Sequence, residues 1–294
     1  MNRLDEIVQS AERKSCTISA LVKEKEALSM GKTEEEIISA MEERYDVMLR
    51  VYEEGIAEET RSVSGLTGGE GHRLMKYEEQ HSGGFYPKAA ARAMGIANVN
   101  ASMGRIVAAP TAGSCGILPA ALISLAEQHH KRKEEVVNCL FTASFIGEVI
   151  AENASLSGAE GGCQAECGSA AAMAAGAGVE LCGGTPGQAA DAAAFALEAV
   201  MGLVCDPVAG LVECPCIKRN AFGAVQALLA IDMALAGIKS VIPADEVITA
   251  MGEVGRSMPE SLRETAKGGI AATPTGKKIA KRLTNFNDPN SGLQ

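Results

Sequence analysis

Apolar side chains recur at helical spacing along the first fifty residues. Thr33 followed by Glu36 matches a capping box, the pair of side chains that satisfies backbone N–H groups at a helix start. The apolar positions after it share one helical face: Ile37, Met41, Tyr45, Met48 and Tyr52. We therefore predict N-terminal helices over about residues 1–60, one of which begins after Thr33 and buries one side.

Beyond residue 136 the pattern is almost wholly helical. Five segments run past ten residues without the period-2 alternation of strands: 136–154, 164–181, 187–204, 220–237 and 244–258. A further helix is predicted over 257–269, with Pro259 in its first turn and Gly268 as its cap. The sequence thus predicts a single all-α domain, with helices that are rich in Ala and Gly and can approach closely. We place its core at about residues 61–285.

Composition and charge narrow the class of protein. The chain has 294 residues, 47% hydrophobic and 22% charged, which suffices for a large buried core. No apolar run reaches the roughly 18 residues of a membrane span, and no secretory signal is visible, so we expect a cytoplasmic protein. A net charge of −10 without a basic stripe disfavours nucleic acid as a partner.

Cysteines crowd into one part of the chain. Six of the nine lie in under a fifth of the length: 163, 167, 182, 205, 214 and 216. In the cytoplasm such cysteines are reduced thiols or metal ligands, and thiolates favour iron–sulfur clusters, zinc or copper(I). The spacings match no common zinc module, and five candidates remain open: Cys163, Cys167, Cys205, Cys214 and Cys216. We expect Cys163 and Cys167 on one helical face, and Cys214 and Cys216 in an extended piece around Pro215.

Two loops of small residues carry hydroxyl groups. The first is SVSGLTGGEG at 62–71, and the second, PTAGSCG at 110–116, leads into a predicted helix. Backbone N–H groups at a helix start form an anion site suited to a carboxylate. The candidate binding residues are Ser64, Thr67, Gly68, Thr111, Gly113 and Ser114. Cys115 is predicted to be a small buried residue, and His72 and His81 are predicted to be peripheral.

Several blocks carry a resemblance to a known family. GCQAECGSAAAMAA (162–175) and CDPVAGLVECPCIKRNAFGA (205–224), with 100–122 and SGLTGG (64–69), resemble the α chain of the bacterial iron–sulfur L-serine dehydratases. The resemblance implies a lyase that converts L-serine to pyruvate and ammonia. It also implies a [4Fe-4S] cluster with one open iron and with Cys163, Cys205 and Cys216 as ligands, and no pyridoxal phosphate. Cys167 and Cys214 are then packing residues.

The family also implies a partner. Its members are either one long polypeptide or two chains, so we expect a β chain that supplies the catalytic base. If this chain supplies the base instead, the candidates are His72, His81 and Glu166. Three alternatives stay open: a cysteine desulfidase-type lyase, an iron–sulfur electron carrier or redox sensor with Cys167 or Cys214 as fourth ligand, and a zinc-stabilised helical interaction module.

Overall fold

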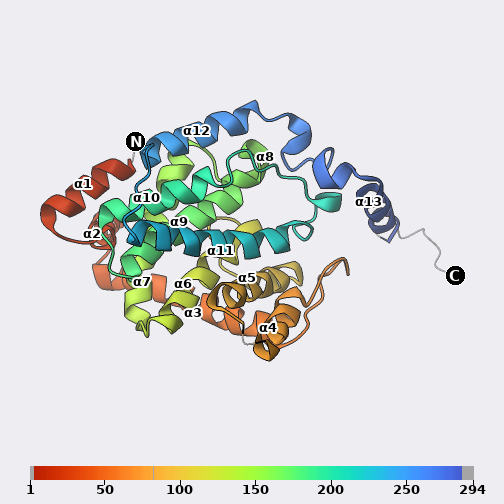
Figure 1. Ribbon diagram of the computed structural model, residues 1–294, viewed down its shortest axis with the longest axis horizontal. Coiled ribbons are helices and arrows are strands. Elements are labelled where there is room, and N and C mark those ends of the chain that lie inside the picture. Colours follow the sequence, from red (N-terminus) through yellow and green to blue (C-terminus); the bar gives the residue numbers. More distant parts are fainter. Residues whose placement is uncertain (1–2, 82, 287–294) are drawn as a thin grey trace.

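The computed structural model describes residues 3–81 and 83–286, and helices dominate this part of the chain (Figure 1). The α-helices of the described residues are α1 (Leu4–Lys14), α2 (Ile18–Met30), α3 (Glu34–Ala57), α4 (Glu70–Gln80), α5 (Phe85–Ala101), α6 (Ile117–Gln128), α7 (Lys133–Asn153), α8 (Gly158–Gly161), α9 (Ser169–Leu181), α10 (Pro186–Glu198), α11 (Cys216–Leu235), α12 (Ala244–Ser257) and α13 (Pro274–Phe286). In those ranges the only β pairing is two isolated bridges, Arg61–Gly68 and Cys205–Arg263. The predicted all-α fold is confirmed.

The predicted capping box is present at the start of α3. The Thr33 hydroxyl accepts a hydrogen bond from Glu36 N, and the Glu36 carboxylate accepts one from Thr33 N at 2.9 Å. The N-terminal region comprises three helices. The start of the first, α1, is held by a residue that is distant in the sequence. Asp245 of α12 accepts hydrogen bonds from the N–H groups of Leu4 and Asp5, both at 2.9 Å, which would otherwise lack partners at the helix start.

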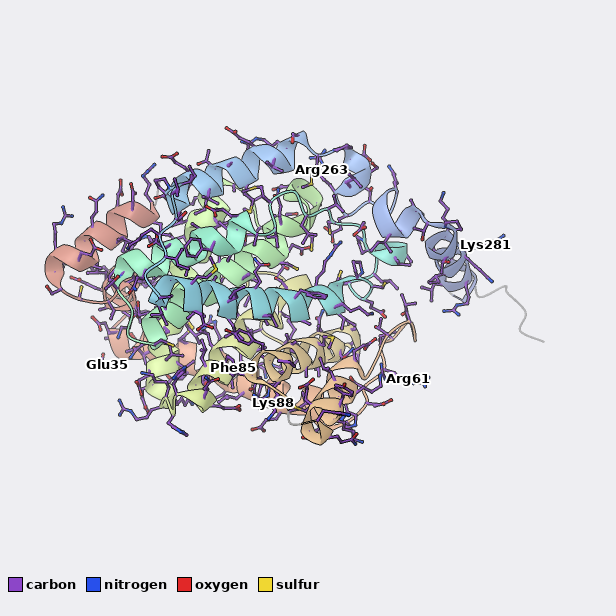
Figure 2. All side chains as sticks on the ribbon, viewed as in Figure 1. Glu35, Arg61, Phe85, Lys88, Arg263 and Lys281 are labelled. Carbon is purple, nitrogen blue, oxygen red and sulfur yellow. The ribbon has the colours of Figure 1, made fainter. Side chains whose placement is uncertain are left out.

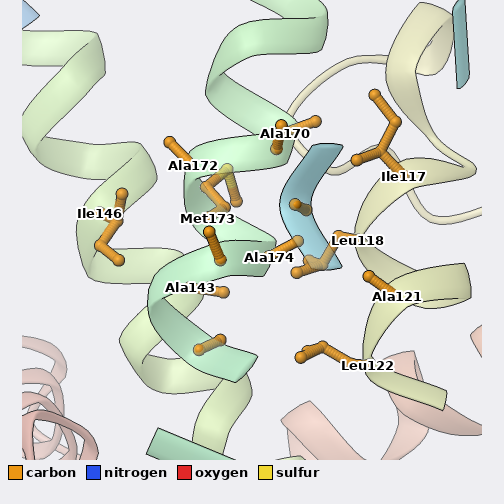
Figure 3. Close-up of a cluster of buried hydrophobic side chains, with 14 of the residues drawn as sticks. Ile117, Leu118, Ala121, Leu122, Ala143, Ile146, Ala170, Ala172, Met173 and Ala174 are labelled. Atoms are coloured by element: carbon orange, nitrogen blue, oxygen red, sulfur yellow. The ribbon is translucent and has the colours of Figure 1, made fainter. Parts of the chain in front are cut away.

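Helix α9 forms the centre of the core. It packs against α6, α7, α10 and α11, and Figure 1 shows it in the middle of the helices that surround it. Its alanines from Ala170 to Ala177 are almost fully buried. In Figure 3 they face Ala143 and Ile146 of α7 on one side and Leu118, Ala121 and Leu122 of α6 on the other. Small side chains on α9 let the neighbouring backbones come close, as the Ala-rich sequence predicts.

A second close approach joins α3, α4 and α5, which lie together at the lower edge of Figure 1. A Cβ atom on Gly95 of α5 would lie 2.5 Å from the Gly55 carbonyl oxygen of α3. Gly71 of α4 also lies against Gly95, since a Cβ atom added to Gly71 would lie 2.4 Å from Gly95 N. Glycine at these crossings permits backbone-to-backbone contact that no other residue allows.

The predicted helix over 257–269 is wrong. Only a 3₁₀ turn, Glu260–Leu262, forms there, and Gly268 precedes a second short turn, Gly269–Ala272, instead of closing an α-helix. Glu264 and Ala266 both have positive φ, at 61° and 55°, which no right-handed helix allows. The backbone of this segment pairs with Cys205 instead, a long-range contact that the local pattern cannot reveal.

The predicted extended piece at 214–216 is also wrong. Residues 212–215 form a turn with a cis peptide between Cys214 and Pro215, and Cys216 is already the first residue of α11. The two thiols therefore do not share a direction along a strand: Cys216 is buried and Cys214 is partly exposed. Among the described residues, no helix is long and apolar enough to cross a membrane.

Candidate active site

Two thiols meet between α8 and α9. The Sγ atoms of Cys163 and Cys167 lie 3.4 Å apart, and both residues are buried. The backbone of Gln164–Gly168, which includes Cys167, is a π-helical turn, an irregularity that often occurs at functional sites. The structure thus confirms that these two cysteines share one side of the segment.

Gln164, which follows Cys163, fixes this turn from inside. Its side chain is fully buried. Its Oε1 accepts a hydrogen bond from Gly202 N at 2.8 Å, and its Nε2 donates one to the Met251 carbonyl at 3.0 Å. One side chain therefore ties the Cys163 turn both to the loop that leads to Cys205 and to α12.

Cys205 is held by the backbone of the segment after α12. Cys205 N donates to Leu262 O at 2.9 Å, and Glu264 N donates to Cys205 O at 2.7 Å. The side chain of the intervening Arg263 reaches back to the Glu160 carbonyl of α8 at 3.5 Å, and Figure 2 labels Arg263 beyond the end of α12. Segment 257–269, for which the sequence wrongly predicts an α-helix, therefore supports Cys205 through backbone hydrogen bonds.

Asn220 connects Cys216 to the second hydroxyl loop. It is fully buried one turn into α11, and its Nδ2 donates to the carbonyls of Cys216 at 2.9 Å and Gly113 at 2.8 Å. Its Oδ1 accepts from Gly116 N at 2.8 Å. Sequence reasoning missed Asn220, although it lies in the quoted CIKRN block. One of the N–H groups expected to bind an anion is therefore already occupied.

Glu166 lies between this loop and the thiols. Thr111 Oγ1 donates to Glu166 Oε1 at 2.9 Å, and Cys205 Sγ lies 3.7 Å from Oε2. Burial, and then the charge of Cys163, raise the pKa of Glu166 to about 7. A Cβ atom on Gly158 would lie 2.6 Å from Glu166 Oε2 and 2.9 Å from Cys205 Sγ, so this space is free only because residue 158 is glycine.

The thiols share one electrostatic environment. Hydrogen bonding with Cys167 and with Cys205, and then the nearby Arg219 guanidinium, lower the pKa of Cys163. The hydrogen bond with Cys163 raises the pKa of Cys205, and burial followed by the charge of Cys163 raises that of Cys216 to about 12. Cys115 has its pKa raised to about 12 by burial alone and packs in the core, as predicted.

A cleft of about 1020 Å³ opens beside the second hydroxyl loop. It is bordered by the first hydroxyl loop (Val63, Ser64, Gly65), by Ala112, by Leu211–Glu213 and by α13. Gly113 lies close both to the cleft and to Glu166: a Cβ atom there would lie 3.4 Å from cleft-lining Val212 Cγ1 and 3.2 Å from Glu166 Oε1. Within residues 3–81 and 83–286, no three His, Cys, Asp or Glu side chains are arranged to hold a single metal ion.

The predicted binding residues fall into two groups. Thr111 and Gly113 adjoin Glu166, and Ser114 is fully buried with its hydroxyl 3.1 Å from that of Thr111. In the other loop, Ser64 Oγ accepts from Leu66 N, Gly68 N donates to Glu70, and Thr67 Oγ1 donates to Glu213 at 2.7 Å. Glu213 lies just before Cys214, so it brings the first loop to the thiol-bearing turn.

The two candidate histidines hydrogen-bond to backbone carbonyls of their own region. His72 Nδ1 lies 2.7 Å from Ile56 O, and His81 Nδ1 lies 2.7 Å from Tyr77 O. The His81 ring also stacks on Tyr77, with 4.0 Å between ring centroids. Of the three residues kept as candidate bases, Glu166 is the one that the fold brings to the cysteines.

Comparison with known proteins identifies the family of this chain. The family model described as "Serine dehydratase alpha chain" matches residues 13–271. The chain belongs to this family. The matched range contains Cys163, Cys205, Cys216 and all of segment 257–269, whereas α13 lies beyond it.

Individual members of the serine dehydratase α-chain family match over most of their length. The chain is 48% identical to the "Probable L-serine dehydratase, alpha chain" of Bacillus subtilis over 95% of this chain and 93% of that one. It is 45% identical to the "L-serine dehydratase, alpha chain" of Peptoniphilus asaccharolyticus over 98% and 100%. It is also 39% identical to the "L-serine dehydratase" of Streptomyces coelicolor, covering 91% of this chain but only 60% of that longer one.

Proposed function

We propose that this chain is the cluster-binding subunit of an L-serine dehydratase, which converts L-serine to pyruvate and ammonia. Membership of the serine dehydratase α-chain family supports the reaction. The observation that carries the assignment of the site is the convergence of Cys163 and Cys205 with Glu166 and Thr111 at one buried place. A thiol group, a carboxylate and a substrate-loop hydroxyl meet there from three segments far apart in sequence.

The residues present suit an iron–sulfur cluster. All nine cysteines of the chain are free, and the donor set at the site is soft sulfur in a buried setting. We assign Cys163, Cys205 and Cys216 as ligands. A four-iron cluster binds each thiolate through a different iron, so its ligands need not surround one point as the ligands of a single ion do. Bound with three thiolates, the cluster supplies Lewis acidity toward the leaving β-hydroxyl group.

The remaining residues bind and orient the substrate. Serine loses its Cα proton and its β-hydroxyl as water, and the aminoacrylate tautomerises to an imine that takes up water to give pyruvate and ammonia. We assign the carboxylate of serine to the two hydroxyl loops, 64–69 and 111–116. The hydrogen bond from Thr111 fixes Glu166 Oε1, which leaves Oε2 directed to Cys205 and able to accept a hydrogen bond from the substrate's ammonium group.

A second chain completes the site in this proposal. A β-elimination needs a base within hydrogen-bond reach of the Cα proton. Both candidate histidines, His72 and His81, are hydrogen-bonded to the backbone away from the thiols. The relatives that match end to end are named alpha chains, and the longer Streptomyces relative has room for further protein. We therefore assign the base to a β chain that covers the cleft.

The test is to co-express this chain with its partner, reconstitute it anaerobically, and measure iron content and pyruvate formed from L-serine. Cys163→Ala, Cys205→Ala and Cys216→Ala should each lose iron and activity, because each removes one of the three assigned ligands. Cys139→Ala is the matched control: the Cys139 residue is 4% exposed against 3% for Cys205, and it lies in α7. It should retain both.

Two results would overturn the proposal. A colourless protein with stoichiometric zinc would replace the lyase by a zinc-stabilised module. Iron retention in all three cysteine variants would remove the ligand assignment. Full pyruvate formation by the isolated chain would refute only the partner's role and would make Glu166 the base to test.

A further inference from the structure

Arg219 joins two segments that flank the candidate ligands. It lies on the first turn of α11, three residues after Cys216. Its Nη1 donates to the Val204 carbonyl at 2.9 Å, and its Nη2 donates to Asp206 Oδ1 at 2.8 Å. The guanidinium thus holds the residue before Cys205 and the residue after it, and the helix that carries Cys216 is fixed against the Cys205 loop.

Asp206 is held from the opposite side as well. Its Oδ2 accepts a hydrogen bond from Ile270 N at 2.7 Å. Gly269, just before, has φ of 55°, and a Cβ atom there would lie 2.2 Å from Asp206 Oδ2. Glycine at 269 is therefore required both by the backbone conformation and by the approach of the carboxylate. Arg219, Asp206 and Gly269–Ile270 form a chain of contacts from α11 to the segment that also pairs with Cys205.

The ion pair is costly to bury and is not explained by helix packing. The Arg219 and Asp206 side chains are only 15% and 3% exposed. Buried pairs seldom improve stability over apolar replacements, whereas removal of one partner leaves an uncompensated charge. The Arg219 guanidinium is also near enough to interact with the Cys163 sulfur, and this interaction lowers the pKa of that thiol. Thiolates that bind iron bring negative charge into this buried place, and a fixed guanidinium offsets it.

We propose that Arg219 is a positioning residue of the active site: it fixes Cys205 relative to Cys216 and supplies the positive charge opposite the ligand thiolates, and Asp206 sets its orientation. This inference rests on the proposed cluster site and goes beyond it, since it assigns a role to the Asp and Arg of the CDP and IKRN blocks. Hydrogen bonds and charge around ligand sulfurs set the potential of a cluster, and residues that orient ligands contribute strongly to metal affinity.

The test compares Arg219→Gln, Arg219→Lys and Asp206→Asn in the full chain after anaerobic reconstitution. Arg219→Gln should retain iron about 10- to 100-fold less well and shift the reduction potential of the remaining cluster to a more negative value. Arg219→Lys should restore the potential, because the charge returns. It should not restore iron retention, because an ammonium group cannot span Val204 and Asp206 as the planar guanidinium does.

Arg92→Gln is the matched control. Its guanidinium is 17% exposed and pairs with Glu127 at 2.6 Å over the Tyr52 ring, away from the thiols. It should leave both the potential and the iron content unchanged. Wild-type potential and retention in Arg219→Gln would overturn the proposal. So would equal effects in Arg92→Gln, because they would show general destabilisation.

A metal-free measurement separates this inference from the proposed function. Trypsin can cut after the exposed Lys267, in the segment that Asp206 holds. Asp206→Asn and Arg219→Gln should speed that cut at least about tenfold relative to the cut after the exposed Arg132. If the wild-type chain holds no iron, the cluster proposal fails and this ratio still decides whether Arg219 and Asp206 fix the Cys205 loop. An unchanged ratio would overturn that role.

Discussion

The helical core around α9 and the loops that carry the thiols are stabilised by different interactions. In the core, alanines of α9 pack on aliphatic side chains of α6 and α7 (Figure 3). Around Cys163, Cys205 and Cys216, single buried polar side chains bind backbone groups: Gln164 binds two distant segments, and Asn220 binds both the 110–116 loop and the start of its own helix. The core tolerates changes of similar volume, whereas each hydrogen-bonding side chain of the loops has no substitute.

The largest expected effect is that of Asn220→Ala. The change leaves the Gly116 N–H and the Gly113 carbonyl without the Asn220 side chain, so we expect a loss of about 3 kcal/mol in the free energy of unfolding. Because Asn220 also fixes the start of α11, iron retention should fall. Denaturant titration of the metal-free chain and iron content after reconstitution measure the two effects.

Asn98→Ala is the control for that comparison. Asn98 is 1% exposed in α5 and bonds Gly71 N and the Glu70 carboxylate, away from the thiols. It should lose comparable stability and keep its iron. If both variants lose iron equally, the thiol loops depend on global stability and the contrast between the two regions disappears.

An intermediate effect is expected from Gly95→Ala at the crossing of α3, α4 and α5. Its Cβ would lie 2.5 Å from the Gly55 carbonyl oxygen, and overpacking of this kind costs about 2 kcal/mol. The thermal or denaturant midpoint should fall while iron retention stays at the wild-type level. Gly187→Ala, in the first turn of α10 where only the Glu12 side chain is within 3.4 Å, should be neutral. Wild-type stability of Gly95→Ala would show that the helices can move apart.

The smallest effect is expected from Thr33→Ala. It removes the capping hydrogen bond to Glu36 N at the start of α3 and should cost about 1 kcal/mol of unfolding free energy. Thr33→Ser should restore the stability, since a serine hydroxyl accepts the same bond. Neither variant should alter iron content, and a loss of iron in Thr33→Ala would show that the helical region and the thiol loops are coupled.

The sequence was most informative where structure depends on local pattern. The capping box at Thr33, the burial of Cys115 and the all-α class follow from residues a few positions apart. The presence of helices was predicted well, and their ends less well. The helix predicted over 187–204 corresponds to α10, which ends at Glu198. Membership of the serine dehydratase α-chain family was also readable from contiguous blocks, as the match over residues 13–271 confirms.

Only the tertiary structure decided what surrounds the thiols. The helix predicted over 257–269 failed because its backbone pairs with Cys205, some sixty positions earlier in the chain. The roles of Gln164, Asn220 and Arg219 could not be predicted from the sequence. An amide or guanidinium side chain gives the same sequence pattern whether it lies at the surface or takes part in a buried hydrogen-bond network. Local periodicity reports which face of a helix is buried, but a hydrogen bond between distant segments leaves no periodic trace, and it is such bonds that place Cys163, Cys205 and Glu166 together.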